Sequence, residues 1–347
     1  MRHRGGSVCV WVLVRAAFAS LALALASCVS FPPAPSAVVE PRIEGERLIA
    51  SDGASLGLSV WRADRPYAVV LAVHGMNDYA GHFRDIGKWL AEAGVTVYAY
   101  DQRGFGRSPE FGRWPGTPAL IADLASAVSA LRSEYPDAPL YVLGHSMGAA
   151  VALAAAAKGP IDADGAILVS PGVWGGSRMP LPYRISLNIA AGLVPGKTLT
   201  GERTGRQSTD NIAVLKEMMA DPYVIKPTRL DAIVGVVRLM GRGWDATNEA
   251  GGRVLVLYGE KDEIVPPKTI RKAASRLCGD VETISYSEGW HLLLRDLQAE
   301  TVWRDIAEWM AGEPDAGAGF GPAAATCAGL AELDGREPSR PMIAAGR

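Results

Sequence analysis

The feature that most constrains the fold is the regular alternation of short apolar runs with segments of helical periodicity. The runs are rich in valine, leucine, isoleucine and tyrosine, and they are short enough for strands. They span residues 68–75, 95–101, 140–146, 165–171, 253–259 and 281–286. Strands that are apolar on both faces are typical of a parallel sheet covered by helices. The alternation therefore predicts an α/β fold with a mostly parallel central sheet flanked by helices.

The ordered core is expected to begin at residue 42. There, "RIEGERLIASDGASLGLSVWRA" predicts two strands joined by a turn at Asp52–Gly53. The strand rhythm then stops between residues 172 and 252, a gap too long for a simple loop. We predict a helical cap there, between core segments 42–171 and 253–311. The alternative is a set of ordinary crossover helices.

Both ends of the chain differ from the core in composition. Residues 312–347 are rich in glycine, alanine and proline, so we predict a disordered tail. Residues 1–27 follow a basic, apolar and small-residue order, which is typical of a secretory signal peptide. A spanning helix is the alternative, but Arg15 interrupts the apolar stretch and leaves it shorter than such a helix needs.

The signal peptide ends in "LASC", whose last residue is Cys28. This pattern resembles the lipobox of bacterial lipoproteins, which implies cleavage before Cys28 and a lipid on that cysteine. The proline-rich residues 28–41 then predict a flexible tether. Because Val29 is not aspartate, we expect a lipid-anchored protein of the bacterial outer membrane that faces the periplasm.

Charge and cysteine spacing exclude several other classes of function. The chain of 347 residues has a formal net charge of -2, so a nucleic-acid partner is not expected. Its four cysteines show no CxxC or Cys/His spacing. We therefore predict no metal site; the sequence leaves the oligomeric state open.

The stretch "YVLGHSMGAAVALAAAA" places Ser146 between an apolar run and an alanine-rich helix. Gly144 and Gly148 flank it and complete G-x-S-x-G, the pattern of a nucleophilic serine in a sharp strand-to-helix turn. The helix that follows directs backbone N–H groups at developing negative charge. We therefore predict that Ser146 is a catalytic nucleophile; the alternative is a surface serine in a tight turn.

A serine nucleophile needs a histidine base and a carboxylate that orients it. In this architecture the order is serine, acid, histidine, which selects His291 in "SEGWHLLLRD". The acid is expected in "LYGEKDEIVP", where we choose Asp262 and keep Glu260 as the fallback. The oxyanion donors are predicted to be the N–H groups of Met147 and Met76.

Five stretches in this order resemble the α/β-hydrolase family, and its monoacylglycerol lipase, lysophospholipase and serine aminopeptidase-like branch. They are "HGMNDYAGHF", "YDQRGFGRS", "GHSMGAA", "GEKDEIVP" and "GWHLLLRD". The resemblance implies a cofactor-free enzyme with a helical cap. It also implies that "YDQRGFGRS" supports the elbow, where we expect Asp101 to pair with Arg103.

The combined pattern predicts a serine hydrolase that cleaves carboxylic esters. Monoacylglycerols or lysophospholipids are the expected substrates, since the cap is rich in apolar residues and methionine adapts to flexible apolar ligands. The cap residues behind this expectation are Trp174, Met179, Tyr183, Met218, Met219, Met240 and Trp244. A peptidase, an acyltransferase, or a non-catalytic envelope lipoprotein with a hydrolase fold remain alternatives.

Overall fold

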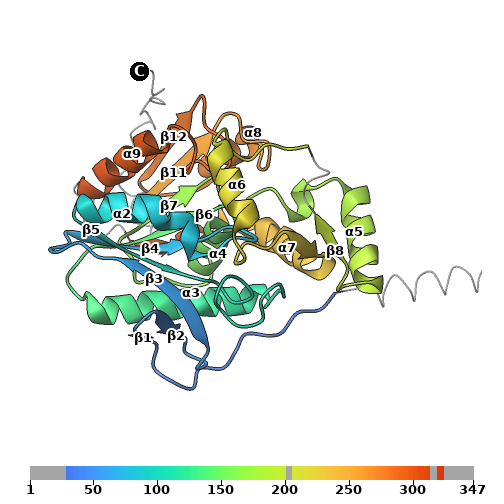
Figure 1. The fold of residues 1–347 in the computed structure, drawn as a ribbon, viewed down its shortest axis with the longest axis horizontal. Coiled ribbons are helices and arrows are strands. Elements are labelled where there is room, and N and C mark those ends of the chain that lie inside the picture. Colours follow the sequence, from blue (N-terminus) through green and yellow to red (C-terminus); the bar gives the residue numbers. More distant parts are fainter. Residues whose placement is uncertain (1–28, 201–204, 313–318, 324–347) are drawn as a thin grey trace, which may run out of the picture.

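A computed structural model describes residues 29–200, 205–312 and 319–323. Nine strands form one sheet in the order β1-β2-β3-β5-β4-β6-β7-β11-β12 (Figure 1). The strands are β1 (Arg42–Glu44), β2 (Arg47–Ile49), β3 (Ser55–Trp61), β4 (Ala68–Val73), β5 (Val95–Tyr100), β6 (Leu140–His145), β7 (Gly165–Val169), β11 (Val254–Gly259) and β12 (Val281–Tyr286). The strands from β5 to β12 in this order are parallel, and β1, β2 and β3 add an antiparallel edge. The predicted α/β fold is confirmed, and each of the six apolar runs contains one parallel strand.

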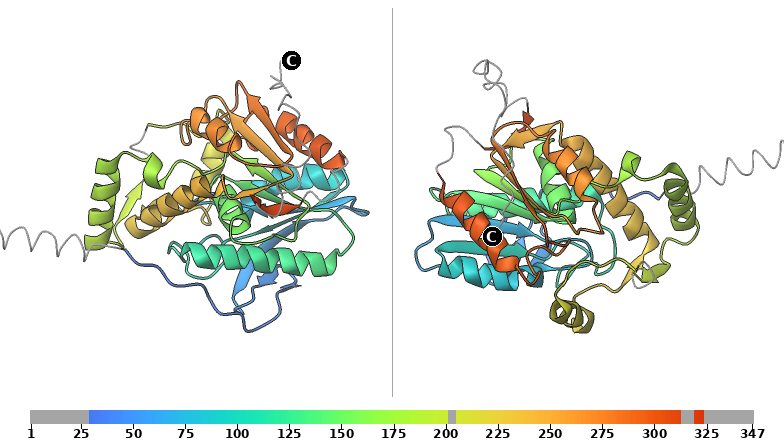
Figure 2. Two further views of the ribbon diagram at one scale, coloured as in Figure 1. Left: turned by 180° about the vertical axis from the view of Figure 1, so that it is seen from behind. Right: turned by 90° about the horizontal axis from the view of Figure 1, so that it is seen from above.

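Helices cover both faces of the sheet (Figure 2). The helices α2 (Arg84–Glu92) and α9 (Ala299–Ala311) pack on one face, and α3 (Thr117–Glu134), α4 (Met147–Ala156), α7 (Leu230–Ala246) and α8 (Pro267–Ala274) on the other. Alternate residues of β4 face opposite layers: Val69 and Leu71 point to α3 and α4, while Val70 packs on the α2 side. All three are fully buried, and burial of such a side chain contributes about 1.5–3 kcal/mol.

The start of the core contains one more strand than the sequence predicted. The stretch expected to form a single strand before Asp52 is a hairpin, in which β1 pairs with β2. Gly45 lies in the turn with φ of 60°, a left-handed conformation that glycine adopts without strain. A hairpin this short carries too few residues for a periodic signal.

The insertion at residues 172–252 contains the short helix η2 (Gly176–Arg178), α5 (Leu181–Leu193), α6 (Ile212–Ala220) and α7. It also contains a small sheet of β8 (Thr198–Thr200) and β9 (Pro227–Arg229), which the sequence reading did not predict. The far end of α7 packs on the core, since a Cβ on Gly243 would lie 3.0 Å from Ala150 Cβ. α7 therefore packs on the core as the alternative prediction of an ordinary crossover helix expects. The helices η2, α5 and α6 come before α7 in the insertion.

Parts of both predicted flexible ends are packed against the fold. β13 (Phe320–Pro322) pairs with β10 (Ala250–Gly252), and Phe320 is 1% exposed. Disorder was therefore the wrong prediction for residues 319–323, because a pattern of three residues gives no strand signal. The start of the tether also packs on the fold: Phe31 contacts both the core and the cluster between α5 and α7. The predicted signal peptide, Cys28 and the tail beyond residue 323 lie outside the described residues.

Within the described ranges, none of the helices combines the length and the apolar character needed to cross a bilayer. Cys278 forms an isolated backbone β-bridge with Gly251 of β10, and its thiol is disulfide-bonded.

Candidate active site

The turn between β6 and α4 has the strained geometry predicted for a nucleophile. Ser146 adopts φ of 51° and ψ of −110°, and α4 begins at the next residue. A Cβ on Gly148 would lie 2.0 Å from the Val73 carbonyl oxygen, and one on Gly144 would lie 2.5 Å from the Ala149 nitrogen. Only glycine at these two positions lets α4 approach the sheet closely enough to form the turn.

The three side chains predicted to react together do meet at the carboxyl end of the sheet. His291 Nε2 lies 2.9 Å from Ser146 Oγ, and His291 Nδ1 lies 2.8 Å from Asp262 Oδ2. Asp262 and His291 are each 5% exposed, so water competes little for these contacts. In this arrangement the imidazole can accept the serine proton while the carboxylate holds the other ring nitrogen protonated.

Asp262, rather than the fallback Glu260, is placed to orient the histidine. Its other oxygen, Oδ1, accepts hydrogen bonds of 2.8 Å from the backbone N–H groups of Ile264 and Val265. Those bonds fix the carboxylate so that Oδ2 faces His291. Glu260 instead pairs with Arg271 at the surface.

The loop after β4 brings the predicted oxyanion donor Met76 beside the serine. A Cβ on Gly75 would lie 3.4 Å from Ser146 Cβ, so this loop runs past the nucleophile. Met76 follows Gly75, and Met147 is the first residue of α4. Both predicted donors therefore belong to backbone segments next to Ser146.

Residues of the insertion 172–252 hold this loop in place, which the sequence did not indicate. Asn77 has φ of 65°, and its side-chain amide donates to Thr228 Oγ1 at 2.6 Å. The Asn77 carbonyl oxygen accepts from Ile225 N–H, and Tyr79 OH donates to Asp221 Oδ2 at 2.6 Å. Asparagine tolerates the left-handed conformation, so the residue type at position 77 was the one local sign of this turn.

A buried histidine, His145, contacts the backbone of His291. Burial, together with the rings of His82 and His291, holds the pKa of His145 well below the ordinary histidine value. The neutral ring can donate its Nε2–H to the His291 carbonyl oxygen, 3.0 Å away. His82 stacks on His145 with a 4.4 Å centroid distance, and its Nδ1 contacts Asp78. His145 Nε2 thus faces the backbone of His291 rather than the Ser146 hydroxyl.

The loop that carries His291 is held by a buried carboxylate. Asp296 accepts hydrogen bonds from Trp290 N–H at 2.7 Å and from Thr209 Oγ1 at 2.6 Å. Leu292 N–H donates to the Ser208 carbonyl oxygen. Burial raises the pKa of Asp296 above its ordinary value. Residues just before α6 thus fix the histidine loop, a long-range contact with no local sequence signal.

The expected pairing in "YDQRGFGRS" is wrong. Asp101 Oδ2 binds Arg107, at 2.8 Å, and Asp101 Oδ1 accepts from Ala80 N–H. Arg103 instead binds Asp52 and Asp123. The loop does join the segment after Met76 to the sheet. Asp101 finds its partner within the same stretch, whereas the partners of Arg103 lie 20 and 51 residues away.

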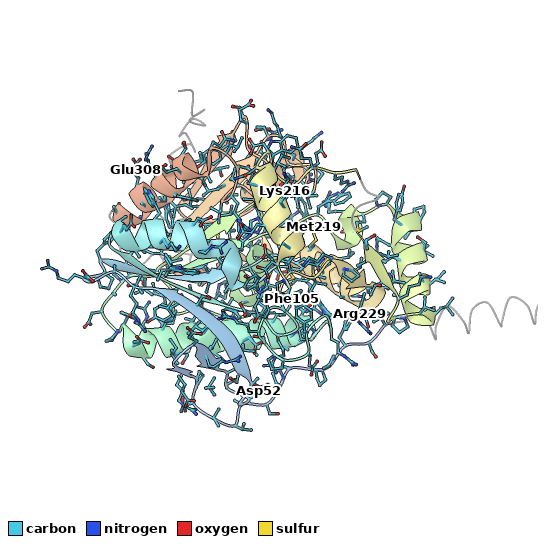
Figure 3. The ribbon with its side chains drawn as sticks, viewed as in Figure 1. Asp52, Phe105, Lys216, Met219, Arg229 and Glu308 are labelled. Carbon is cyan, nitrogen blue, oxygen red and sulfur yellow. The ribbon has the colours of Figure 1, made fainter. Side chains whose placement is uncertain are left out.

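The aromatic and methionine residues predicted for the cap have three different environments. Trp244 lies in the core, with the Arg178 guanidinium 4.0 Å from its ring. Tyr183 and Met219 are exposed, and Met219 belongs to α6 (Figure 3). Trp174 and Met240 are partly buried against the core, and a Cβ on neighbouring Gly175 would meet Met240 Cβ. Burial of Trp244 in the core, and exposure of the other two side chains, argue against an acyl-binding role for these three residues.

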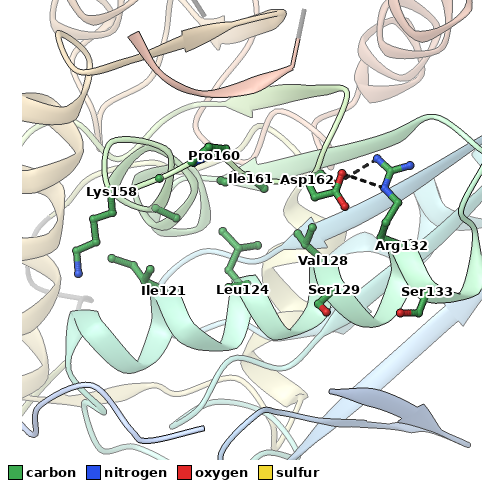
Figure 4. Close-up of a pocket in the computed structure, with 13 residues that line it drawn as sticks. Ile121, Leu124, Val128, Ser129, Arg132, Ser133, Lys158, Pro160, Ile161 and Asp162 are labelled. Atoms are coloured by element: carbon green, nitrogen blue, oxygen red, sulfur yellow. Dashed lines mark hydrogen bonds and ion pairs between the residues drawn. The ribbon is translucent and has the colours of Figure 1, made fainter. Parts of the chain in front are cut away.

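A cavity of about 590 Å³ lies elsewhere, between α3 and the segment after α4. Its lining includes Leu124, Val128, Lys158 and Ile161, with an Arg132–Asp162 ion pair at one side (Figure 4). None of the three site residues lines it, so this cavity is separate from the serine.

The parallel sheet, the strained serine turn and the hydrogen-bonded Ser146, His291 and Asp262 define an α/β-hydrolase. Residues 64–298 match the family model described as serine aminopeptidase, S33. The match covers more than half of the chain, which therefore belongs to this hydrolase family.

The relatives extend the comparison. A monoacylglycerol lipase of Mycolicibacterium smegmatis is 27% identical over 278 residues, covering 74% of this chain and 93% of the relative. Human monoglyceride lipase is 24% identical to this chain, and the alignment covers 76% of this chain and 89% of the human protein. The crystal structure of Paleococcus ferrophilus monoacylglycerol lipase superimposes with a TM-score of 0.61 at 23% identity, over 74% of this chain and 98% of that one.

Proposed function

We propose that the chain is a carboxylic ester hydrolase that cleaves monoacylglycerols through an acyl-enzyme on Ser146. The observation that carries the proposal is the hydrogen-bonded series from Ser146 through His291 to Asp262. It is supported by similarity to a monoacylglycerol lipase over 93% of that relative's length. Lysophospholipids are the second substrate class, since they also carry one ester-linked acyl chain.

The geometry supports the following reaction. Ser146 Oγ attacks the ester carbonyl carbon while its proton passes to His291 Nε2, and the carbonyl oxygen becomes an oxyanion. The N–H groups of Met76 and Met147 stabilise that oxyanion, each contributing about 3 kcal/mol to the barrier reduction. His291 returns the proton to the leaving glycerol oxygen. Water then attacks the acyl-enzyme, with His291 again as base, and releases the fatty acid.

The acyl chain is expected to contact the partly buried side chains beside the serine. Gly172 N–H donates to the Ser146 carbonyl oxygen, so the first cap segment begins at the nucleophile. Trp174 and Met240 follow as its apolar neighbours. Each methylene buried there contributes about 0.8 kcal/mol, which corresponds to roughly fourfold in affinity.

The experiment measures kcat/KM for monoacylglycerols and simple esters of increasing chain length, beside aminoacyl amides. We expect a rise with chain length, loss of turnover in Ser146→Ala, and labelling of the unsubstituted chain by a fluorophosphonate. Faster amide cleavage would favour the peptidase alternative. Acyl transfer to glycerol in preference to water would favour the acyltransferase. An unlabelled Ser146 would favour the non-catalytic lipoprotein.

We further propose that the mature chain begins at Cys28 and is held by its lipid in the outer membrane, facing the periplasm. The support is the "LASC" ending of the signal-like segment. One acyl chain gives only marginal membrane binding, whereas two or more anchor a protein stably. Intact-mass analysis should show the lipid on the wild type and none on Cys28→Ser.

A further inference from the structure

The first described residues are bound to the cap. The Arg238 guanidinium on α7 donates a 2.6 Å hydrogen bond to the Val29 carbonyl oxygen. It also donates to Asn188 Oδ1 on α5 and lies 5.5 Å from the Phe31 ring centroid. Phe31 packs edge-on against Trp114, at 6.4 Å between ring centroids. We call residues 29–32 the strap.

The strap also fills an apolar seam. Val29 and Phe31 pack on a buried cluster formed by Ala191 of α5 with Leu230 and Val234 of α7. Figures 1 and 2 show the described chain beginning beside α5 before it crosses to the sheet edge. The contacts with Arg238 and this cluster fix the position of residue 29 against the cap.

The opposite face of α5 is apolar and exposed. At spacings of four residues it presents Leu181, Ile185, Ile189 and Leu193, which are 60%, 51%, 43% and 61% exposed. Large apolar side chains gathered on one side of a surface helix mark an interaction site rather than ordinary surface. We call these four residues the α5 stripe.

Charge identifies the kind of partner. Residues 172–200, which surround the stripe, contain three cationic residues and no aspartate or glutamate. They are Arg178, Arg184 and Lys197. Asp231, whose N–H donates to the Pro195 carbonyl oxygen just after α5, is neutralised by its ion pair with Arg229. An apolar helix face flanked by the cations of its own segment fits the interface of a bilayer that contains anionic lipid.

We propose that the strap and the α5 stripe form one bilayer-docking platform, in which the strap ties the membrane anchor to the cap. This rests on the proposed anchor at Cys28. Neighbouring Cα atoms are about 3.8 Å apart, so an anchor directly before Val29 brings the edge of α5 to the lipid surface. The cap, which borders Ser146, then faces the bilayer in which a single-chain ester resides.

The first test measures depth in the membrane. The full chain is reconstituted in vesicles of phosphatidylcholine and phosphatidylglycerol, with a fluorophore on Ile185→Cys or on Glu308→Cys. Glu308 lies on α9, far from Arg229, the residue before α7 (Figure 3). Lipids brominated in their acyl chains should quench the label at residue 185 and not at 308. Equal quenching at both positions, or none at 185, would overturn the proposal.

The second test separates the platform from catalysis. The Ile185→Asp/Ile189→Asp variant should bind vesicles at least about tenfold more weakly and hydrolyse vesicle-borne monoacylglycerol correspondingly slowly. Turnover of a soluble short-chain ester should stay within about twofold. Leu297→Asp, at a site 74% exposed beside α9, is the matched control and should change neither.

Arg238→Met tests the strap itself and should reduce quenching at residue 185 without changing soluble-ester turnover. A soluble ester that is not cleaved by the unsubstituted chain would refute the proposed function instead. Intact vesicle turnover in the double aspartate variant would refute the platform. A variant that instead breaks a dimer, measured by light scattering in detergent, would assign the α5 stripe to a second copy of the chain and also refute it.

Discussion

Replacing Asp262 with asparagine should move the ring proton of His291 from Nδ1 to Nε2 while leaving the fold intact. Both backbone donors, Ile264 N–H and Val265 N–H, bind the same oxygen, Oδ1. The amide oxygen must take that position, since an NH₂ group there would face two donors. The amide nitrogen then faces His291 Nδ1 at the 2.8 Å position now held by Oδ2.

An NH₂ group in that position donates to Nδ1, so the imidazole carries its proton on Nε2. Nε2–H then points at Ser146 Oγ, 2.9 Å away, and cannot accept the serine proton. A base held in the wrong tautomer lowers kcat by about 10³–10⁴, or about 4–5.5 kcal/mol in the barrier. Because both residues are buried, solvent offers little rescue.

The assay compares kcat for a soluble ester in Asp262→Asn and in Glu260→Gln, with thermal unfolding as the check on folding. The control removes an exposed ion pair with Arg271 and should keep kcat within about twofold. A kcat loss of less than tenfold in Asp262→Asn, or a large loss in Glu260→Gln, would refute this assignment of the acid.

Three further predictions concern stability. Gly148→Ala should destabilise the chain by about 1–3 kcal/mol and reduce turnover, because its Cβ would lie 2.0 Å from the Val73 oxygen; Gly159→Ala, with open space around it, should do neither in denaturant unfolding and activity assays. Because the pKa of His145 is depressed in the folded state, stability should be lost as pH falls below about 6.5, by about 1.4 kcal/mol per unit for this group. In urea titrations His145→Gln should flatten that slope, and an unchanged slope would contradict a neutral His145. Cys278 is disulfide-bonded, so reductant should lower the unfolding free energy by about 2–4 kcal/mol, and Cys278→Ser should no longer respond.

Local pattern was enough to predict much of this molecule. Strands buried on both faces need continuous apolar runs, so all six parallel strands could be read within a residue or two of their ends. The elbow was also readable, because only glycine fits on either side of Ser146. Chain order selected His291 and Asp262, and the structure brings both into one hydrogen-bonded series with Ser146, since the sheet brings its carboxyl ends to one edge.

Partners distant in sequence were not readable. Arg103 binds Asp52 and Asp123 rather than Asp101, because several carboxylates are equivalent in sequence and only folding selects between them. Phe320 is part of the core, although the composition around it predicted disorder. Its position is set by pairing with the distant strand β10, which leaves no local sequence signal.

The sequence alone determined the fold class and the three candidate site residues, because short-range sterics and hydrophobic periodicity act within a few residues of each site. The tertiary structure decided what holds and surrounds that site: His145 behind the base, Asn77 tied to the cap, and the strap bound by Arg238. Those contacts join residues far apart in the chain, and their geometry exists only once the sheet has brought the segments together.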